Sequence, residues 1–178
     1  EKKGADLLLQ ALGEVLATPV AGKDAGIHLM LAGPPGDAAF MERLQELSTS
    51  AAQSARGRLA VSFPGMLSGA VKWGAFRTAD SFILPSHQEN FGVAVAEALA
   101  CRVPVLISNK VNIWREVEAD QAGLVADDTL GGTTGLLTKW LDMPPAARDA
   151  MARRGFASFR NHFHIDSSAE RLLATIKS

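Results

Sequence analysis

Residues 81–100 read SFILPSHQENFGVAVAEALA, and no other segment constrains the architecture as strongly. The first part, residues 81–84, is a short apolar run stopped by Pro85, which predicts a buried strand. The run from about Gly92 to Cys101 is apolar and rich in alanine, which predicts a partly buried helix. A strand that feeds a helix through a polar loop is the first half of a β-α-β unit.

The same alternation continues on both sides of this segment. Further strands are expected at residues 27–32, 59–63, 104–108 and 123–125. Helices are expected at residues 5–17, 37–54, 68–78 and 112–119, and from Gly132 onward, with a break near Pro144 and a final segment over 166–177. Alternating strands and helices predict an α/β fold with a parallel sheet. Continuous apolar strands predict that helices cover both faces of that sheet.

Length, charge and composition limit the classes of protein to which this chain can belong. A length of 178 residues predicts one domain. Lys and Arg total 18 and Asp and Glu total 19, so the formal net charge of -1 gives no general case for nucleic acid or an anionic membrane. No apolar run reaches the roughly 18 residues typical of a membrane span. The single cysteine, Cys101, excludes an internal disulfide and fits a reducing compartment, so we expect a cytoplasmic protein.

No metal site is expected. One cysteine cannot form a thiolate-rich zinc site. His162 and His164 lie near Asp166, but this segment resembles a helix boundary and no fourth ligand is evident, so surface or capping histidines are favoured. The glycine-rich residues 131–135 lack the lysine of a phosphate-binding loop, and we expect a loop that leads into a helix there.

A parallel sheet binds ligands in the crevice at the carboxyl ends of its strands. Those ends are predicted at residues 33–36, 64–67, 85–91 and 108–112. We therefore expect any site of this chain on these four loops.

Two glutamates mark the third of these loops. Glu89 precedes the predicted helix and Glu97 lies inside it. Eight helical residues span about 12 Å, a length scale similar to that of a sugar joined to a ribose by a diphosphate. The amides of Phe91, Gly92 and Val93 open the helix and offer donors and a partial positive charge to an anion. Gly92 has no side chain, so a phosphate can approach the backbone there.

Each of these residues also has a structural interpretation. Glu89 could be a solvated loop acid, and Glu97 could form a salt bridge with a lysine or arginine from elsewhere. Phe91 could anchor the loop in the core, and Gly92 could serve only the turn. Taken together on one crevice loop, the residues favour a nucleotide-sugar site.

The segment Glu89-Asn90-Phe91-Gly92-Val93-Ala94-Val95-Ala96-Glu97 matches the pattern E-x-F-G-x-x-x-x-E. With Lys3-Gly4 near the start, Phe63-Pro64-Gly65, and Pro85-Ser86 after the strand, the chain resembles the C-terminal domain of a retaining glycosyltransferase of family 4 (glycosyl transferases group 1). This resemblance covers nearly the whole chain. It implies a three-layer Rossmann-like sheet, one half of the two-domain GT-B architecture.

The resemblance also implies roles for individual residues. Glu97 would bind the ribose hydroxyls, Glu89 the donor sugar near the reacting carbon, and Lys3 the diphosphate, although Lys3 could instead be a solvated terminal lysine. The implied catalytic residues are Glu89 and Lys3. The implied substrate-binding residues are Glu97, Asn90, Phe91, Gly92, Val93, Gly33, Met66 and Leu67.

The implied activity is transfer of a sugar, with retention, from a nucleotide-diphospho-sugar to an acceptor, with no metal or other cofactor. Residues 1–178 would form the donor-binding domain, with the first strand truncated and the N-terminal acceptor domain absent. The fragment alone would then bind a nucleotide but transfer little sugar, and peripheral membrane contact would belong to the full-length protein. A non-catalytic flavodoxin-like binding module and a GT-B-type sugar epimerase remain alternatives.

Overall fold

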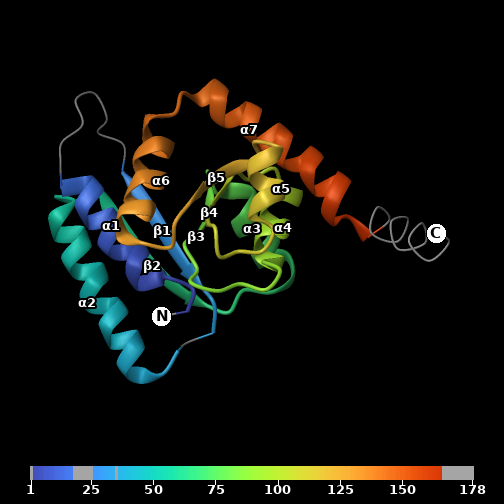
Figure 1. The fold of residues 1–178 in the computed structure, drawn as a ribbon. Coiled ribbons are helices and arrows are strands. Elements are labelled where there is room, and N and C mark those ends of the chain that lie inside the picture. The colour runs from blue at the N-terminus through green and yellow to red at the C-terminus, as the bar shows by residue number, and fades with distance from the viewer. Residues whose placement is uncertain (1, 18–25, 35, 166–178) are drawn as a thin grey trace.

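The computed structural model describes residues 2–17, 26–34 and 36–165 (Figure 1). The helices are α1 (Ala5–Ala17), α2 (Ala38–Ser54), α3 (Gly69–Thr78), α4 (Val93–Ala100), α5 (Trp114–Ala119), α6 (Leu130–Asp142) and α7 (Pro145–Ser158), which runs into a π-helical turn, η1 (Phe159–Phe163). The strands are β1 (Ile27–Ala32), β2 (Leu59–Gly65), β3 (Phe82–Leu84), β4 (Val105–Ser108) and β5 (Gly123–Ala126). The helical segment expected over 166–177 lies outside the described residues.

All the strand pairs described are parallel, as the alternation of strands and helices predicts. β1 pairs with β2, and β3, β4 and β5 pair in that order. Within the described residues, no ladder joins β1 to β3, so the strands form two sheets that lie next to each other in Figure 1. The expected single sheet is thus divided into a β1–β2 pair and a sheet of β3, β4 and β5.

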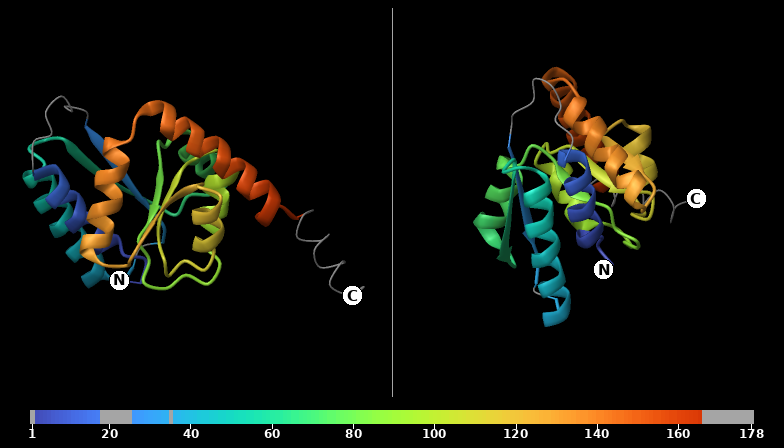
Figure 2. Two further views of the ribbon diagram at one scale, coloured as in Figure 1. Left: turned by 45° about the horizontal axis from the view of Figure 1, so that its top comes forward. Right: turned by 90° about the vertical axis from the view of Figure 1, so that its left-hand side faces the viewer.

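Helices cover both faces of β4, which is buried at every residue. Val105 and Ile107 point into a core shared with α4 and α5. Leu106, between them, points into another core with Leu136 of α6 and Met151 of α7. Because successive strand residues face opposite sides of a sheet, this alternation gives a three-layer α/β structure, as expected. Figure 2 shows α1, α2 and α6 gathered on one side of the strands.

The β1 strand departs from this expectation. Ile27, Leu29 and Leu31 pack into a core with α1 and α2. The alternate residues of β1 are exposed, and Met30 keeps 45% of its surface. The run 27–32, apolar except for His28, predicted burial on both faces, but its alternate residues are exposed, and α3, the helix that follows β2, has no buried residue.

Element ends follow local chemistry. Asp37 caps α2 by accepting a hydrogen bond from the amide of Phe40 at 2.8 Å. β2 continues through Pro64 to Gly65, beyond the stop predicted at the proline. The glycines at 131–135 lie inside α6 and not in a loop, because Thr129 caps the helix ahead of them. None of the helices that the structure describes combines the length and the apolar character that a membrane span requires.

Candidate functional site

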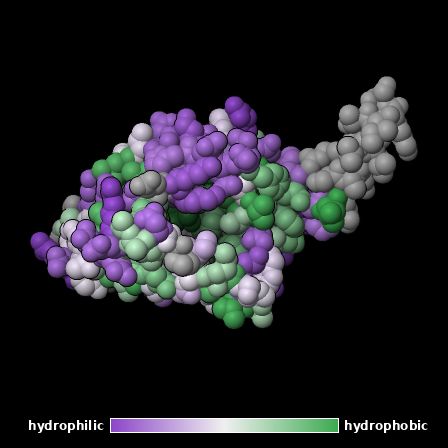
Figure 3. Space-filling model, turned by 90° about the horizontal axis from the view of Figure 1, so that it is seen from below, coloured by the Kyte–Doolittle hydropathy of each residue, from purple (hydrophilic) through white to green (hydrophobic). Residues whose placement is uncertain are grey.

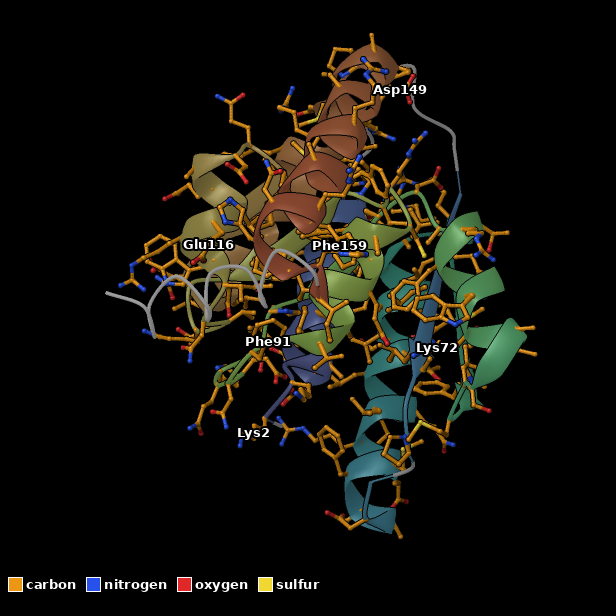
Figure 4. All side chains as sticks on the ribbon, turned by 90° about the vertical axis from the view of Figure 1, so that its right-hand side faces the viewer. Lys2, Lys72, Phe91, Glu116, Asp149 and Phe159 are labelled. Atoms are coloured by element: carbon orange, nitrogen blue, oxygen red, sulfur yellow. The ribbon has the colours of Figure 1, made fainter. Side chains whose placement is uncertain are left out.

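The carboxyl ends of the strands gather four loops at one edge of the molecule. Figure 3 looks onto this edge and shows a hollow with hydrophobic residues beside it and hydrophilic residues around its border. Figure 4 places Lys2 and Phe91 toward this end and Asp149 at the opposite end. A neighbouring concavity at the ends of β4 and β5 is lined by residues that include Asn109, Trp114 and Asp127.

Lys3 and Glu89 meet at this edge. The Lys3 amino group donates to the Glu89 carboxylate, whose side chain is 18% exposed. The backbone that carries Lys3 is fixed to the loop after β3, because the carbonyl of Lys2 accepts from the His87 amide at 3.0 Å and lies 2.9 Å from the Ser86 hydroxyl. The structure thus brings together the two residues expected to be catalytic.

Gly4 allows this close approach. Its φ is +70°, and a Cβ at this position would lie 2.2 Å from the carbonyl oxygen of Pro85. A side chain would therefore push the segment 2–4 away from the loop that holds Glu89. The glycine of the lysine-glycine pair is therefore required sterically, because only a residue without a side chain lets this segment approach Pro85. The sequence did not reveal this contact.

The electrostatic surroundings of Lys3 are unusual for a lysine. Partial burial lowers the pKa of its amino group below the ordinary 10.5, and the charge of neighbouring Lys2 lowers it further. The Glu89 carboxylate acts in the opposite direction by favouring the cation. The Lys3 side chain is nevertheless 58% exposed, so an anionic ligand can reach its ammonium from solvent.

The backbone of Glu89 is fixed from the other side by the loop after β4. Its amide donates to the carbonyl of Lys110 at 3.0 Å, and its carbonyl accepts from the amide of Asn112 at 3.2 Å. This gives an isolated parallel bridge between Glu89 and Val111. The carboxylate therefore projects from a backbone held at both its polar groups.

Gly92 opens α4 in a left-handed conformation, with φ 79° and ψ 51°. Its carbonyl accepts from the amides of Val95 and Ala96, at 2.8 and 3.2 Å, which starts the helix. A Cβ at Gly92 would lie 2.9 Å from Val111 Cγ1. The expected turn role of Gly92 is therefore present, and it also places the N-terminus of α4 beside Glu89.

The residues flanking Gly92 are more exposed than a core role would allow. Phe91 retains 48% and Val93 61% of their surface. Phe91 makes an edge-on contact with Phe163, at 5.9 Å between ring centroids. Asn90 is also exposed. The interpretation of Phe91 as a core anchor is thus wrong, and these side chains border an accessible surface.

Glu97 is partnered as the structural alternative predicted. Its Oε1 lies 2.6 Å from Nζ of Lys72, a residue of α3 that no motif singled out. The pair is largely withdrawn from water, with Lys72 31% and Glu97 23% exposed. Both glutamates of the pattern therefore carry a lysine partner, one from each side of the loop.

The other predicted binding residues lie at the ends of β1 and β2. The amide of Gly33 donates to the carbonyl of Gly65 at 3.0 Å, which ties these two ends together. Met66 is 66% exposed, and Leu67 is half-buried. They lie on the loop that leads into α3, the helix that carries Lys72.

A third charged group at this edge was not singled out by any motif. His87 Nδ1 lies 2.9 Å from Oδ2 of Asp128, and Lys110 Nζ lies 4.0 Å from Oδ1 of the same carboxylate. The hydrogen bond with His87 is the largest influence that lowers the pKa of Asp128 below 3.8. Three separate segments of the chain supply this cluster, so no local spacing could have predicted it.

In the part of the chain described here, no group of three or more metal-ligating side chains is assembled. His162 Nε2 instead lies 3.1 Å from the carboxylate of Asp120. Cys101 is partly buried and packs against the core that α4 and β4 share.

Comparison with known proteins places this arrangement in a family. The family model described as glycosyl transferases group 1 matches residues 1–156. A D-inositol 3-phosphate glycosyltransferase of Thermomonospora curvata is 28% identical over 173 residues, covering 96% of this chain and 39% of the relative. The lipopolysaccharide core biosynthesis mannosyltransferase LpsB of Rhizobium meliloti is 27% identical over 187 residues, covering 99% of this chain and 48% of the relative.

Solved structures share the fold at lower identity. A glycosyltransferase of Rickettsia africae superposes with a TM-score of 0.78 at 15% identity, covering 99% of this chain and 44% of that one. The C-terminal domain of a glycosyl transferase group 1 protein (LpcC) from Francisella tularensis gives 0.73 at 18% identity, covering 92% of this chain and 81% of that domain. These likenesses confirm that the fold is that of a GT-B glycosyltransferase domain.

The chain spans about two fifths of the length of the curated relatives it matches first, from 39% to 37%. Because the family model covers residues 1–156 of 178, the chain belongs to the glycosyl transferases group 1 family.

Proposed function

We propose that this chain is the donor-binding domain of a retaining glycosyltransferase, which transfers a sugar from a nucleotide-diphospho-sugar to an acceptor. The observation that carries the proposal is the meeting of Lys3, Glu89 and the N-terminus of α4 at one edge of the sheet. A cation and an open helix N-terminus beside a carboxylate can hold a diphosphate next to a polyhydroxylated sugar.

The chemistry assigned to these groups follows from charge. Departure of a nucleoside diphosphate places negative charge on phosphate oxygens, and Lys3 with the amides of Gly92 and Val93 can stabilise it. The sugar gains oxocarbenium character, and Glu89 can orient its hydroxyls close to the reacting carbon. Glu97 takes the ribose hydroxyls at the other end of the donor. Phe91 and Asn90 border the sugar, while Gly33, Met66 and Leu67 face the nucleoside.

The proposal assigns no metal and no other cofactor, because Lys3 and α4 supply positive charge where a cation would act. It also keeps the cytoplasmic location expected from a single cysteine, which fits a reducing compartment. No nucleic-acid partner is assigned, and any peripheral membrane contact belongs to the whole protein.

We further propose that the whole protein supplies a strand that lies between β1 and β3. Both strands have an edge without a ladder partner among the described residues. The carbonyl of Lys2 is bonded beside the carboxyl end of β3, so a strand leading into α1 would end there and run parallel to β3. Such a strand would unite the two sheets, and an N-terminal domain ahead of it would bind the acceptor.

Titration calorimetry with UDP, GDP and ADP tests the donor site. The chain should bind one of them, and Glu97→Ala should weaken that binding by about 1.5 to 3 kcal/mol, as for a hydrogen bond to a charged group. Glu46→Gln, on the exposed face of α2, is the matched control and should bind as the wild type does. No binding of any of the three, or equal binding by Glu97→Ala, would contradict the assignment.

Product analysis of the whole protein tests the reaction. Transfer with the anomeric configuration of the donor retained supports the proposal, and the 178-residue chain alone should transfer little sugar. Inversion of the configuration, or epimerisation of the donor sugar with no transfer, would contradict it.

A further inference from the structure

Lys72 lies outside every recognised motif, yet it completes the surroundings of Glu97. It is carried by α3, and its Nζ lies 2.6 Å from Glu97 Oε1 on α4. Less than a third of either side chain is exposed. At such a distance the contact is a charge-assisted hydrogen bond in a partly desolvated place, which is stronger than a surface ion pair.

Aromatic side chains fix the position of Lys72. Its Nζ lies 4.5 Å from the ring centroid of Trp73, a distance typical of a cation–π contact. The Trp73 ring lies 6.1 Å from Phe76, and Phe76 lies 5.7 Å from Phe82 of β3. This chain of rings connects the helix to the sheet, so the amino group has a defined place. Figure 4 shows Lys72 on the side of the molecule formed by α3.

Glu97 needs such a partner because of its neighbours. Val95, Ala98 and Leu99 on the same short helix are completely buried. A carboxylate among them is costly unless a charge or hydrogen bonds compensate for the lost water. Without Lys72, the Glu97 side chain would turn toward solvent, and this change would misplace an acceptor of hydrogen bonds.

The geometry leaves Glu97 able to bind a ligand. Lys72 contacts Oε1, and a carboxylate has a second oxygen that accepts further hydrogen bonds. A pair of neighbouring hydroxyls can donate to that oxygen while the lysine holds the first. The loop of Met66 and Leu67 leads into α3, so Lys72 also lies one helical turn from the loop assigned to the nucleoside.

We propose that Lys72 is a positioning residue that holds Glu97 directed at the ribose diol of the donor nucleotide. This inference rests on the proposed function, since it concerns the ribose end of the same site. It assigns Lys72 no contact with the phosphates or with the reacting carbon. Lys72 therefore controls how strongly the chain distinguishes a ribose from a sugar without its 2′ and 3′ hydroxyls.

The test compares two ligands on matched variants. Calorimetry measures the affinity for the nucleoside diphosphate that binds best among UDP, GDP and ADP, and for its 2′,3′-dideoxy analogue. Lys72→Met removes the charge but keeps an unbranched aliphatic side chain, and it should weaken binding of the ribonucleotide about tenfold, as expected when one charge-assisted hydrogen bond loses its orientation. Binding of the dideoxy analogue should change less than about twofold, because Glu97 does not contact it.

Two further variants separate positioning from other roles. Lys72→Arg keeps the cation and should recover most of the discrimination between the two ligands. Lys139→Met, at an exposed position of α6, removes a lysine elsewhere and should leave both affinities unchanged. Far-ultraviolet circular dichroism checks that each variant is folded.

The outcomes distinguish this inference from the proposed function. If Lys72→Met lowers the affinity for both ligands equally, or for neither, the positioning role is overturned while the donor site stands. If the wild-type chain binds none of the three nucleotides, the proposed function is overturned, and the role of Lys72 falls with it.

Discussion

Lys3 and Glu89 are separated by 86 positions in the sequence, and the fold pairs their side chains at the carboxyl edge of the sheet. The pairing depends on Gly4, which lets the segment that carries Lys3 lie against Pro85. It also depends on the Lys2 carbonyl, which His87 holds through its backbone amide. An exposed lysine is thereby fixed beside the loop that opens α4.

Removal of the Lys3 charge should weaken binding of a nucleoside diphosphate. We expect Lys3→Met to lose about tenfold or more in affinity, as when a phosphate loses one charge-assisted hydrogen bond. The parent nucleoside, which has no phosphate, should bind the variant and the wild type alike. Calorimetry with both ligands makes the comparison, and an equal loss for both would show that Lys3 supports the fold and not the diphosphate.

The affinity for a diphosphate should fall as the pH rises. The anion binds the protonated form of Lys3, and the pKa of free Lys3 is lowered from 10.5, so the loss should begin below that pH. Calorimetry at a series of pH values from neutral to 10.5 measures this loss of affinity. The same series on Lys3→Met gives the part of the pH dependence that comes from titration of the ligand, and this part is subtracted. Lys3→Arg should stay charged and keep its affinity over this range. A wild-type profile that parallels Lys3→Met would contradict the prediction.

Gly92 should tolerate no side chain. Its φ is +79° and a Cβ would lie 2.9 Å from Val111, so Gly92→Ala should lower the free energy of unfolding by about 1 to 2 kcal/mol or more. Gly135→Ala is the control, because Gly135 lies inside α6 with open space around its Cα. It should raise the free energy of unfolding by up to about 1 kcal/mol. Urea denaturation measures the free energy of unfolding of both variants. An unchanged value for Gly92→Ala would contradict the described turn.

Asp128 should stabilise the fold except in acid. Its pKa is lowered in the folded chain, mainly by the hydrogen bond with His87, so the folded state binds fewer protons than the unfolded state. The stabilisation is complete above the unfolded value of 3.8 and is lost as the pH falls through the lower folded pKa. Asp128→Asn should therefore cost about 1 kcal/mol at neutral pH and progressively less below 3.8.

Denaturation of both proteins at a series of pH values measures this difference. Asp149→Asn, at an exposed position of α7, is the matched control and should show no such dependence. A cost for Asp128→Asn that stays constant down to the lowest pH would contradict the assigned hydrogen bond.

Local sequence was sufficient for most elements, because their signals are local. The apolar run at 81–84 and the alanine-rich helix that follows it predicted β3 and α4 to within one or two residues. Asp37 predicted the start of α2, since a cap acts only three residues away. Pro64 did not end β2, because the neighbouring backbone continues to pair through Gly65. The exposure of Met30 depends on where α3 packs, and no pattern within β1 reports that.

The site was predictable only in part. Spacing suggested Glu89 and Glu97, since both lie on one continuous segment with a helix N-terminus between them. It could not supply Lys72, which lies 25 positions from Glu97, or the meeting of His87 with Asp128 across 41 positions. Those contacts are set by the packing of α3 against α4 and by the sheet order, which are properties of the tertiary structure.

Mapping of amide chemical shifts by nuclear magnetic resonance, with UDP, GDP or ADP added to the labelled chain, locates the nucleotide. The donor-site proposal predicts that the largest shifts fall on the amides of residues 89–97, with further changes at Lys3 and Gly33. Shifts that gather instead around Asn109, Trp114 and Asp127 in the concavity at β4 and β5, or no shifts with any of the three nucleotides, would contradict it.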